Sequence, residues 1–234
     1  HKERQMEKQK NFSEETWLQD YQAQTEARLA RNLAHMQRGV RFIDLQSAYI
    51  DEQVEIGEGT VIGPCVTLEG NTVIGRDCVI RQNTRIKDAR IADRVEIESS
   101  VILESSIGSG TTVGPFAYLR PHTKVGAGCK VGDFVEMKNS SFGDGSKAAH
   151  LTYVGDADVG SGVNLGCGVV FVNYDGTHKY RAQVGDDVFV GCNSNLVSPV
   201  QIGDGAYIAA GSTVTEDVEA DALYIARKIG RAHV

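Results

Sequence analysis

Residues 56–80, IGEGTVIGPCVTLEGNTVIGRDCVI, decide the fold, because an aliphatic residue returns at every sixth position of this stretch. These aliphatic residues are Ile56, Ile62, Leu68, Ile74 and Ile80. A small or β-branched residue stands two positions before each of them, and alternate residues of a strand face the same side. Both sets are therefore expected to point inward, while the Gly, Asp, Asn and Pro residues between them form corners.

The six-residue period continues from Ile56 to Phe171 and, after an interruption, from Val184 to Val214. It predicts about 27 short strands with one inward aliphatic residue each. Three corners close a triangular coil of about 18 residues, and about nine stacked coils form an all-β parallel β-helix. The period alone does not fix the hand of the coil, although the general rule for parallel crossovers favours a right-handed one.

A polar, helix-forming segment precedes the repeats. Ser13 is a suitable helix cap and Gly39 a natural end, so residues 1–40 are expected to form a helical interdomain arm. Its apolar residues predict a face that packs on a neighbouring element. They are Trp17, Tyr21, Leu29, Leu33 and Met36. We expect the β-helix domain to span residues 41–228, whereas residues 229–234, IGRAHV, read like the translation of a sequencing adapter and are taken as a non-native tail.

The composition narrows the classes of partner. A net charge of -7 disfavours nucleic acid and anionic membranes as general partners, although a local cluster of Arg and Lys can still bind a small anion. No apolar run reaches about 18 residues, the length of a membrane span, so no membrane insertion is expected. The five cysteines form no C-x-x-C pair, which favours free thiols in a reducing, cytoplasmic location.

Residues 147–179 combine several polar side chains with the interruption of the period at residues 173–183. His150 stands at a corner of the predicted coil, where an imidazole can take a proton from an amine at neutral pH. Arg120 and Lys138 are 18 residues apart, which is one coil length. They are therefore expected to stack on one edge and to hold an anion between them.

Six ordered motifs of the chain resemble one family closely. They are VGPFAYLRP (113–121), VGDFVEMK (131–138), GSKAAHLTYVGDA (145–157), NLGCG (164–168), NYDGTHK (173–179) and FVGCNSNLVSPV (189–200). They resemble the C-terminal acetyltransferase domain of the bacterial bifunctional N-acetylglucosamine-1-phosphate uridyltransferase/glucosamine-1-phosphate N-acetyltransferase, from about residue 35 onward. The resemblance implies a left-handed parallel β-helix of hexapeptide repeats.

The same resemblance implies a function. The expected reaction is the acetyl-CoA-dependent N-acetylation of glucosamine-1-phosphate, in a pathway that leads to UDP-N-acetylglucosamine for the cell wall. A cytoplasmic homotrimer with sites between its subunits is implied, and no metal is needed for the transfer. The Gly-rich nucleotide loop of the family's uridyltransferase domain does not occur in this sequence, so uridylyl transfer is not expected of it.

The resemblance also assigns roles to individual residues. His150 is implied as the general base. The residues implied at the amino-sugar phosphate are Arg120, Lys138, Tyr153, Asn164 and Lys179, the last in its own or a neighbouring subunit. Glu136 is a candidate to orient the histidine or the substrate amine. The residues implied at acetyl-CoA are Cys167, Asn173, Tyr174, Cys192, Ala210 and Arg227. Asp133 and Asn139 stand where the family usually has Asn and Lys, which makes the phosphate site less basic than usual.

Two alternatives remain open. Another hexapeptide-repeat acyltransferase with a different amino acceptor would share most of these motifs, and a panel of acceptors would separate it. A non-catalytic β-helix would share only the repeats, and it predicts that loss of His150 changes no activity. A β-helix carbonic anhydrase is excluded, because His122, His150 and His178 lie 28 residues apart, which is not a multiple of the coil length.

Overall fold

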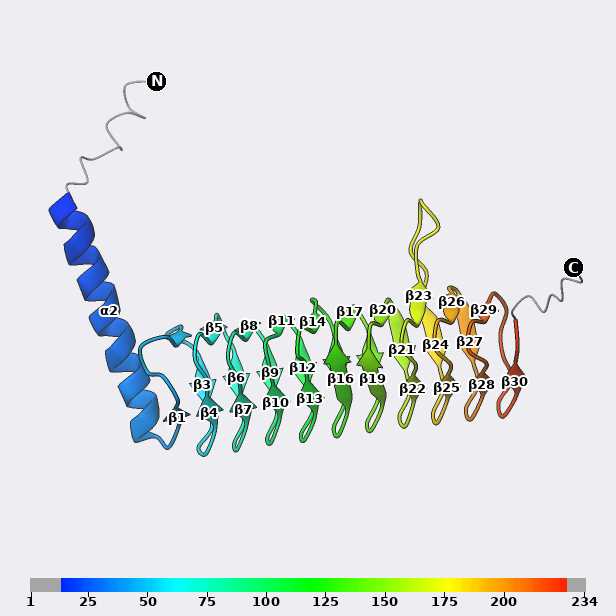
Figure 1. The fold of residues 1–234 in the computed structure, drawn as a ribbon, viewed down its shortest axis with the longest axis horizontal. Helices are drawn as coiled ribbons and strands as arrows, with labels where there is room; N and C mark the ends of the chain where they lie inside the picture. The colour runs from blue at the N-terminus through cyan, green and yellow to red at the C-terminus, as the bar shows by residue number, and fades with distance from the viewer. Residues whose placement is uncertain (1–13, 227–234) are drawn as a thin grey trace, which may run out of the picture.

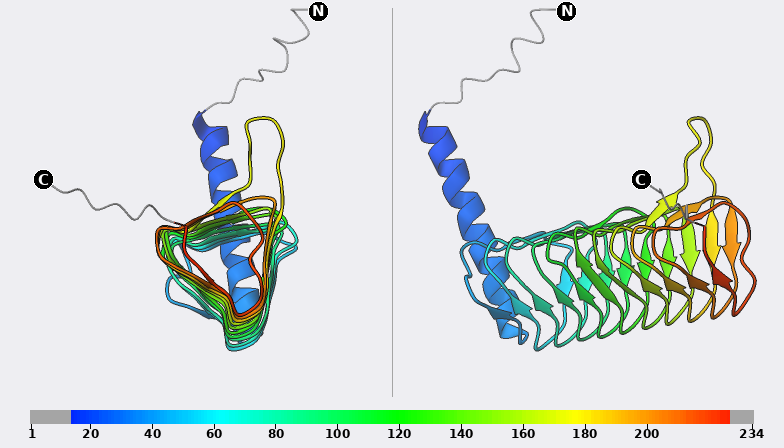
Figure 2. Two further views of the ribbon diagram at one scale, coloured as in Figure 1. Left: turned by 90° about the vertical axis from the view of Figure 1, so that its right-hand side faces the viewer. Right: turned by 45° about the vertical axis from the view of Figure 1, so that its right-hand side comes forward.

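The structure of the chain, a computed structural model, describes residues 14–226. These residues form one helix, α2 (Glu14–Gln37), followed by thirty strands of two to four residues, β1 to β30. The strands wind into an elongated coil, and α2 crosses its N-terminal end at an angle (Figure 1). Along its axis the coil is a triangle, from one side of which a loop projects (Figure 2).

Three parallel sheets form the sides of the triangle, and each strand pairs with its equivalents in the neighbouring coils. Sheet A contains β1 (Arg41–Phe42), β4 (Val61–Ile62), β7 (Val79–Ile80), β10 (Glu96–Ile97), β13 (Thr112–Val113), β16 (Lys130–Asp133), β19 (Lys147–His150), β22 (Asn164–Leu165), β25 (Phe189–Val190), β28 (Tyr207–Ile208) and β30 (Leu223–Tyr224). Sheet B contains β2 (Tyr49–Ile50), β5 (Thr67–Glu69), β8 (Arg85–Lys87), β11 (Val101–Leu103), β14 (Tyr118–Leu119), β17 (Glu136–Lys138), β20 (Tyr153–Gly155), β23 (Val170–Val172), β26 (Asn195–Val197) and β29 (Thr213–Val214). Sheet C contains β3 (Glu55–Ile56), β6 (Val73–Ile74), β9 (Arg90–Ile91), β12 (Ser106–Ile107), β15 (Lys124–Val125), β18 (Ser141–Phe142), β21 (Ala157–Val159), β24 (Ala182–Val184) and β27 (Val200–Ile202). The coil is a left-handed parallel β-helix.

The interior of the coil is built as the six-residue period predicts. All the inward aliphatic residues predicted between Ile56 and Val214 are buried, and each contributes about 1.5 to 3 kcal/mol to folding. The small positions keep their polar groups satisfied: the Thr60 hydroxyl donates to the Gly75 carbonyl at 2.8 Å and accepts from the Cys78 amide at 3.0 Å. The predicted all-β parallel β-helix is therefore confirmed.

Three strands lie outside the predicted period, so the expected count of about nine coils was too low. Strands β1 and β2 precede Ile56, and β30 follows Val214. The inward residues of β1 and β30 are Phe42 and Tyr224, which are only partly buried against the core. Because aromatic residues replace the aliphatic ones at these ends, the repeat is harder to read there.

The face of α2 that meets the coil is polar, contrary to the prediction. Asn32 and His35 are buried, at 0% and 2% exposure. The Asn32 amide donates to the carbonyls of Leu45 and Ala48 at 2.9 and 3.1 Å, which ties the helix to the first coil. Four of the five apolar residues expected on this face are instead exposed, namely Trp17, Tyr21, Leu33 and Met36.

The end of the helix is as predicted. Gly39 has a φ of 90°, a left-handed conformation that a glycine adopts without strain, and the Val40 amide donates to the His35 carbonyl at 3.1 Å. Burial, followed by the charges of Arg38 and Arg31, lowers the pKa of His35 to about 4. The expected cap Ser13 and the tail at 229–234 lie outside the described residues.

Candidate active site

A histidine and an aspartate meet where sheet A turns into sheet B, a corner that we call the A/B edge. The described strands of sheet A are two residues long except β16 and β19, which have four. This extension places Asp133 opposite His150 in register, and His150 Nδ1 lies 2.7 Å from Asp133 Oδ1. The hydrogen bond with His150 lowers the pKa of Asp133. The His150 side chain is 57% exposed.

Four of the residues assigned by resemblance stack along the A/B edge. Hydrogen bonds between successive corners fix the order of these residues. The amides of Leu151, Gly168, Asn193 and Gly211 donate to the carbonyls of Asp133, Leu151, Cys167 and Cys192, respectively. His150, Cys167, Cys192 and Ala210 therefore occupy equivalent positions in successive coils. The Cys192 residue is exposed and Cys167 is half-buried, and both thiols are free.

An apolar patch runs along the A/B edge, beside His150 and in the two coils before it. Phe116, Phe134 and Leu151 are 59%, 58% and 56% exposed, and the two phenyl rings stack with centroids 5.5 Å apart. All three residues have positive φ values of 60°, 55° and 43°, which are uncommon for residues with large side chains. Sequence reasoning did not single them out, because an apolar residue in a corner position carries no signal in the six-residue period.

The outer face of sheet B carries the predicted cationic residues. The Arg120 amide donates to the Met137 carbonyl at 2.8 Å, which places Arg120 one coil before Lys138 as the 18-residue spacing predicts. Arg120 also forms an ion pair of 2.8 Å with Glu136, and this contact raises the pKa of the guanidinium. Glu136 thus contacts Arg120, whereas the carboxylate that contacts His150 is that of Asp133.

Lys138 and Lys179 come together although 41 residues separate them in the sequence. Contact with Lys179, followed by desolvation and by the charge of Lys179, lowers the pKa of Lys138. The charge of Asp156 acts in the opposite direction, and Arg120 adds to the lowering. Three cations, Arg120, Lys138 and Lys179, outnumber the two nearby carboxylates, Glu136 and Asp156, so the site favours a bound anion.

The interruption of the repeat is a loop that leaves the coil after β23 and returns at β24, and it projects far from the body of the molecule (Figure 1). An antiparallel bridge between Tyr174 and Lys179 forms its stem. At its tip the Asp175 carboxylate accepts from the amides of Thr177 and His178 at 2.7 and 2.6 Å. The period resumes at Ala182, close to the predicted end of the interruption.

Asp156 joins the base of this loop to the coil. Its carboxylate accepts from the side-chain amides of Asn173 at 2.5 Å and Asn139 at 2.6 Å. Burial raises the pKa of Asp156, but these two hydrogen bonds and the charges of Lys138 and Lys179 outweigh it, and the net pKa is lowered. The side-chain amide of Asn173 is therefore already engaged in the described chain.

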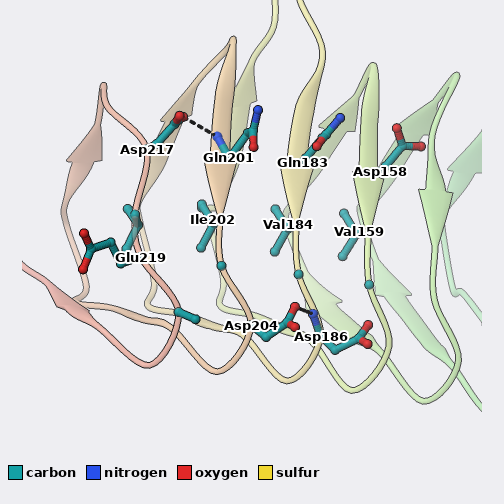
Figure 3. Close-up of a pocket in the computed structure, with 15 residues that line it drawn as sticks. Asp158, Val159, Gln183, Val184, Asp186, Gln201, Ile202, Asp204, Asp217 and Glu219 are labelled. Carbon is teal, nitrogen blue, oxygen red and sulfur yellow. Dashed lines mark hydrogen bonds between the residues drawn. The ribbon is translucent and has the colours of Figure 1, made fainter.

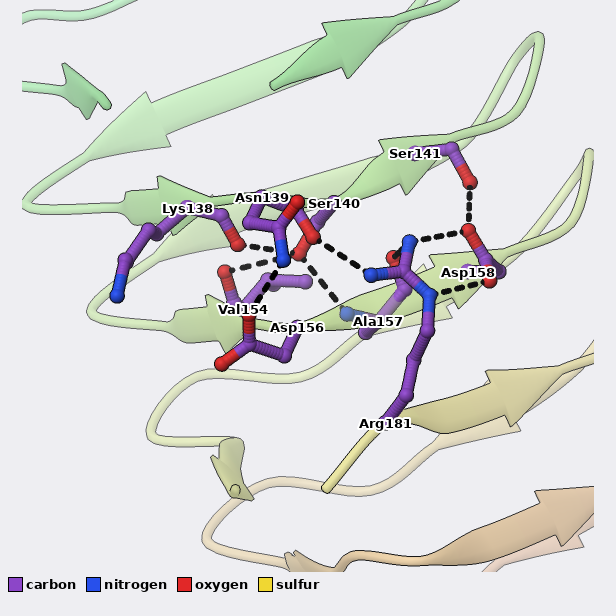
Figure 4. A network of polar contacts seen from close by, with 9 residues as sticks. All are labelled: Lys138, Asn139, Ser140, Ser141, Val154, Asp156, Ala157, Asp158 and Arg181. Carbon is purple, nitrogen blue, oxygen red and sulfur yellow. Dashed lines mark hydrogen bonds and ion pairs between the residues drawn. The ribbon is translucent and has the colours of Figure 1, made fainter. Parts of the chain in front are cut away.

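Arg181 fixes the other end of the loop. Its guanidinium binds both carboxylate oxygens of Asp158 at 2.5 Å and donates to the Asn139 carbonyl at 2.9 Å. Figure 4 shows that Asn139 lies between Asp156 and Arg181, so it links the two anchors of the loop. Asn139 and Asp156 were not predicted as partners, because their contacts depend on the register of three successive coils.

Tyr153 and Asn164 lie on different sides of the coil. Tyr153 begins β20 on sheet B, and a Cβ atom added to Gly155 would lie 2.3 Å from its phenol oxygen, so the ring covers that glycine. Asn164 lies on sheet A, between Lys147 and Phe189 of the adjacent strands. Within one chain Asn164 is therefore not brought together with Arg120 and Lys138. Arg227 lies outside the described residues.

A separate hollow on the outer surface of sheet C contains none of the residues assigned by resemblance. Figure 3 shows its acidic lining, where Asp204 accepts from the Asp186 amide and Asp217 from the Gln201 amide, both at 2.8 Å. Both carboxylates are thus engaged with backbone amides of the preceding coil. Among residues 14–226, no group of three His, Cys, Asp or Glu residues is arranged to hold a metal ion. The helix within this range lacks the length of apolar sequence needed to cross a membrane.

The chain is similar to two family models and to solved structures of other proteins. A family model described as the GMPPB C-terminal domain matches residues 45–117, and one described as bacterial transferase hexapeptide (six repeats) matches residues 104–139 and 181–216. Among solved structures, UDP-N-acetylglucosamine acyltransferase from Arabidopsis has a TM-score of 0.49 at 16% identity and covers 74% of this chain and 67% of its own. A GDP-perosamine N-acetyl transferase from Caulobacter crescentus, in complex with CoA and GDP-perosamine, has a TM-score of 0.42 at 21% identity, covering 52% of this chain and 61% of its own.

Curated relatives are far more similar in sequence. Bifunctional protein GlmU of Clostridium beijerinckii is 56% identical over 196 residues, which are 84% of this chain and 43% of that protein. The same protein of Clostridium novyi is 56% identical over 200 residues, 86% of this chain and 44% of that protein. The chain thus spans less than half the length of these relatives. With this identity and with its hexapeptide-repeat β-helix, the chain belongs to the GlmU family and corresponds to the C-terminal domain of that family.

Proposed function

We propose that the chain transfers the acetyl group of acetyl-CoA to the amine of glucosamine-1-phosphate. In this reaction the C–S bond of the thioester breaks and an amide C–N bond forms. The amine loses a proton and the CoA sulfur gains one, so the products are N-acetylglucosamine-1-phosphate and CoA. The proposal rests on membership of the GlmU family and on the placement of His150. Uridylyl transfer is not assigned to this chain.

The single observation that carries the proposal is the alignment of His150 with Cys167, Cys192 and Ala210 along the A/B edge. A long, extended cofactor such as acetyl-CoA can follow this edge from coil to coil, contacting backbone groups of the corners and placing its thioester beside His150. The ring nitrogen that is not bonded to Asp133, Nε2, then accepts the proton of the attacking amine. Asn164 or a backbone N–H is proposed to stabilise the oxyanion of the tetrahedral intermediate.

The cations of sheet B are proposed to bind the sugar phosphate. Arg120, Lys138 and Lys179 supply the positive charge, and Tyr153 borders them on the same face. Because the ammonium groups of Lys138 and Lys179 repel each other, a phosphate between them relieves repulsion that is present without the ligand. Glu136 is proposed to hold Arg120 in position for this contact.

The site is proposed to be completed in a homotrimer. Asn164 lies on sheet A, whereas Lys179 and the loop lie beside sheet B, so a second copy is needed to bring all the assigned residues around one substrate. In this arrangement Tyr174, with Asn173 and Arg227, contacts acetyl-CoA. Sedimentation velocity at micromolar concentration is expected to give the mass of three chains, and a monomer would contradict the proposal. We propose a cytoplasmic location, in which the product feeds the formation of UDP-N-acetylglucosamine for the cell wall.

The test measures thiol release from acetyl-CoA in the presence of glucosamine-1-phosphate. His150→Asn is expected to lower kcat by about 10²- to 10⁴-fold, which is the contribution of a general base. His122→Asn, which changes another corner histidine in the same way, serves as the matched control and is expected to retain activity. Full activity of His150→Asn would refute the assignment of the base. A panel that includes free glucosamine and other amino sugars tests the acceptor, and preference for one of these would refute the substrate.

A further inference from the structure

We propose that Asp133 is a positioning residue for His150, whose carboxylate accepts the Nδ1–H of the ring and so leaves the Nε2 lone pair to act as the base. The same carboxylate stabilises the imidazolium that forms when the ring takes the proton of the amine. This inference rests on the proposed function for its kinetic consequences. Its structural part, the state of the His150 ring, is independent of any substrate.

The first support is the length of two strands. In the described part of sheet A, β16 and β19 alone extend to four residues, and the added residues bring Asp133 opposite His150. The atoms that meet, Nδ1 and Oδ1, are 2.7 Å apart, a distance typical of a charge-assisted hydrogen bond. A solvated corner carboxylate would need no such extension, so the local backbone is adapted to the pair.

The second support is the glycine next to Asp133. A Cβ atom at Gly132 would lie 1.8 Å from the Ala149 carbonyl oxygen, so only glycine permits the two strands to approach this closely. One residue further along the corner, the Leu151 amide donates to the Asp133 carbonyl at 2.9 Å. The backbone is thus held on both sides of the Asp133–His150 pair, which keeps the two side chains next to each other.

The charges around the ring single out Asp133. Lys130 lies on β16 with Asp133, Lys147 lies on the same strand as His150, and the free thiol of Cys167 follows in the next coil. Among Asp133, the two lysines and the thiol, the Asp133 carboxylate is the group at hydrogen-bond distance from the His150 ring. Because an adjacent negative charge favours the protonated imidazole and the two ammonium groups oppose it, removal of the carboxylate charge makes the ring harder to protonate.

Two substitutions separate the two roles. Asp133→Asn keeps an oxygen that can accept from Nδ1 but removes the charge, whereas Asp133→Ala removes both. With Asp133→Asn we expect the acidic half-point of the kcat–pH profile to move to lower pH, because the charge that favours the imidazolium is gone. With Asp133→Ala we expect kcat to fall by about 10- to 100-fold, the effect of losing one hydrogen bond to a charged group. Asp93→Asn, which changes a corner aspartate that caps the Arg76 amide, is the matched control.

Nitrogen-15 NMR of the ring tests the structural part without substrate. The His150 resonances are assigned by their loss in His150→Asn. In the wild type we expect the neutral ring to carry its proton on Nδ1, and in Asp133→Ala we expect the Nε2–H form to gain population. Nδ1–H fractions that agree in these two proteins would overturn the inference, and so would a titration of His150 that is unchanged in Asp133→Asn.

The two proposals fail in different ways. If the wild type releases no thiol with glucosamine-1-phosphate, the proposed function fails, while the NMR comparison still decides the role of Asp133. If the wild type is active and Asp133→Asn has the pH profile of Asp93→Asn, the positioning role fails while the function stands. Circular dichroism checks that Asp133→Ala is folded, and Asp133→Asn, which is nearly isosteric, carries the test if it is not.

Discussion

The side-chain amide of Asn173 donates a hydrogen bond of 2.5 Å to Asp156, which stands 17 residues earlier in the chain. Asn139 donates to the other oxygen of the same carboxylate at 2.6 Å, and Asp156 is 8% exposed. One buried carboxylate group thus links the residue at which the loop departs to the two preceding coils. We expect the direction of the loop, and with it the position of Lys179, to depend on this contact.

Asp156→Ala is therefore expected to loosen the loop. Both amides lose their acceptor, and because Asn173 is buried at 7% exposure, the cost is about 1 to 3 kcal/mol of folding free energy. We expect faster hydrogen exchange of residues 173–181 and a rise in the KM for glucosamine-1-phosphate that exceeds the fall in kcat. Asp144→Ala, which removes the acceptor of the Ala127 amide at a corner outside the site, is the matched control. Unchanged exchange of the loop in Asp156→Ala would show that Asp156 does not anchor it.

Acid is expected to weaken the second anchor, the ion pair of Asp158 and Arg181. The hydrogen bond from Arg181 lowers the pKa of Asp158 below its ordinary value. A carboxyl group with a depressed pKa in the folded state adds stability that is present above its unfolded pKa of about 3.9 and is lost as the pH falls through the folded value. The difference in melting temperature between wild type and Asp158→Asn should therefore be largest at neutral pH. It should become small below about pH 4. A difference that stays constant from pH 7 to pH 3 would contradict the linkage.

Lys179→Met is expected to change the state of Lys138. Contact with Lys179 is the largest cause of the lowered pKa of Lys138, so its removal should raise that pKa toward the ordinary value of 10.5. The loss of one cation should also raise the KM for glucosamine-1-phosphate by about 10- to 100-fold. Nitrogen NMR of the lysine side chains gives the first quantity and initial rates give the second. Lys124→Met on sheet C is the control, and an unchanged titration of Lys138 would mean that Lys179 does not lie beside it in solution.

The regular part of the coil could be predicted from the sequence because every coil repeats the same environment. An inward residue such as Leu68 or Ile80 meets the same neighbours in each turn, so one residue type recurs at one spacing. This regularity fixed the strands between Ile56 and Val214. It fails where the environment changes, at the aromatic Phe42 and Tyr224 near the ends and on the helix, where Asn32 makes the buried contacts.

The contacts within the site could be predicted only in part. Arg120 and Lys138 are separated by a full coil of 18 residues, so their stacking follows from the spacing. Asp133 and His150 are 17 residues apart, because the coil that contains them is one residue shorter, and an 18-residue repeat does not pair them. Lys138 lies on a strand and Lys179 on the projecting loop, so the repeat spacing does not predict that they meet. These pairs depend on local insertions and deletions whose effect on register becomes visible only in the structure.

Gly132→Ala tests whether the close approach of β16 and β19 serves the site. The added Cβ atom would lie 1.8 Å from the Ala149 carbonyl oxygen, so the strand end that carries His150 must move. We expect a loss of about 1 to 3 kcal/mol in folding free energy, as for other overpacked positions, together with a fall in kcat. Gly110→Ala is the matched control, because an added Cβ meets nothing within 4 Å there and the substitution costs about 1 kcal/mol through its φ of 70° alone. Both variants should lose stability in chemical denaturation, but only Gly132→Ala should lose activity at a temperature where both are folded. Equal activity of the two variants would show that the spacing of these strands matters for folding and not for His150.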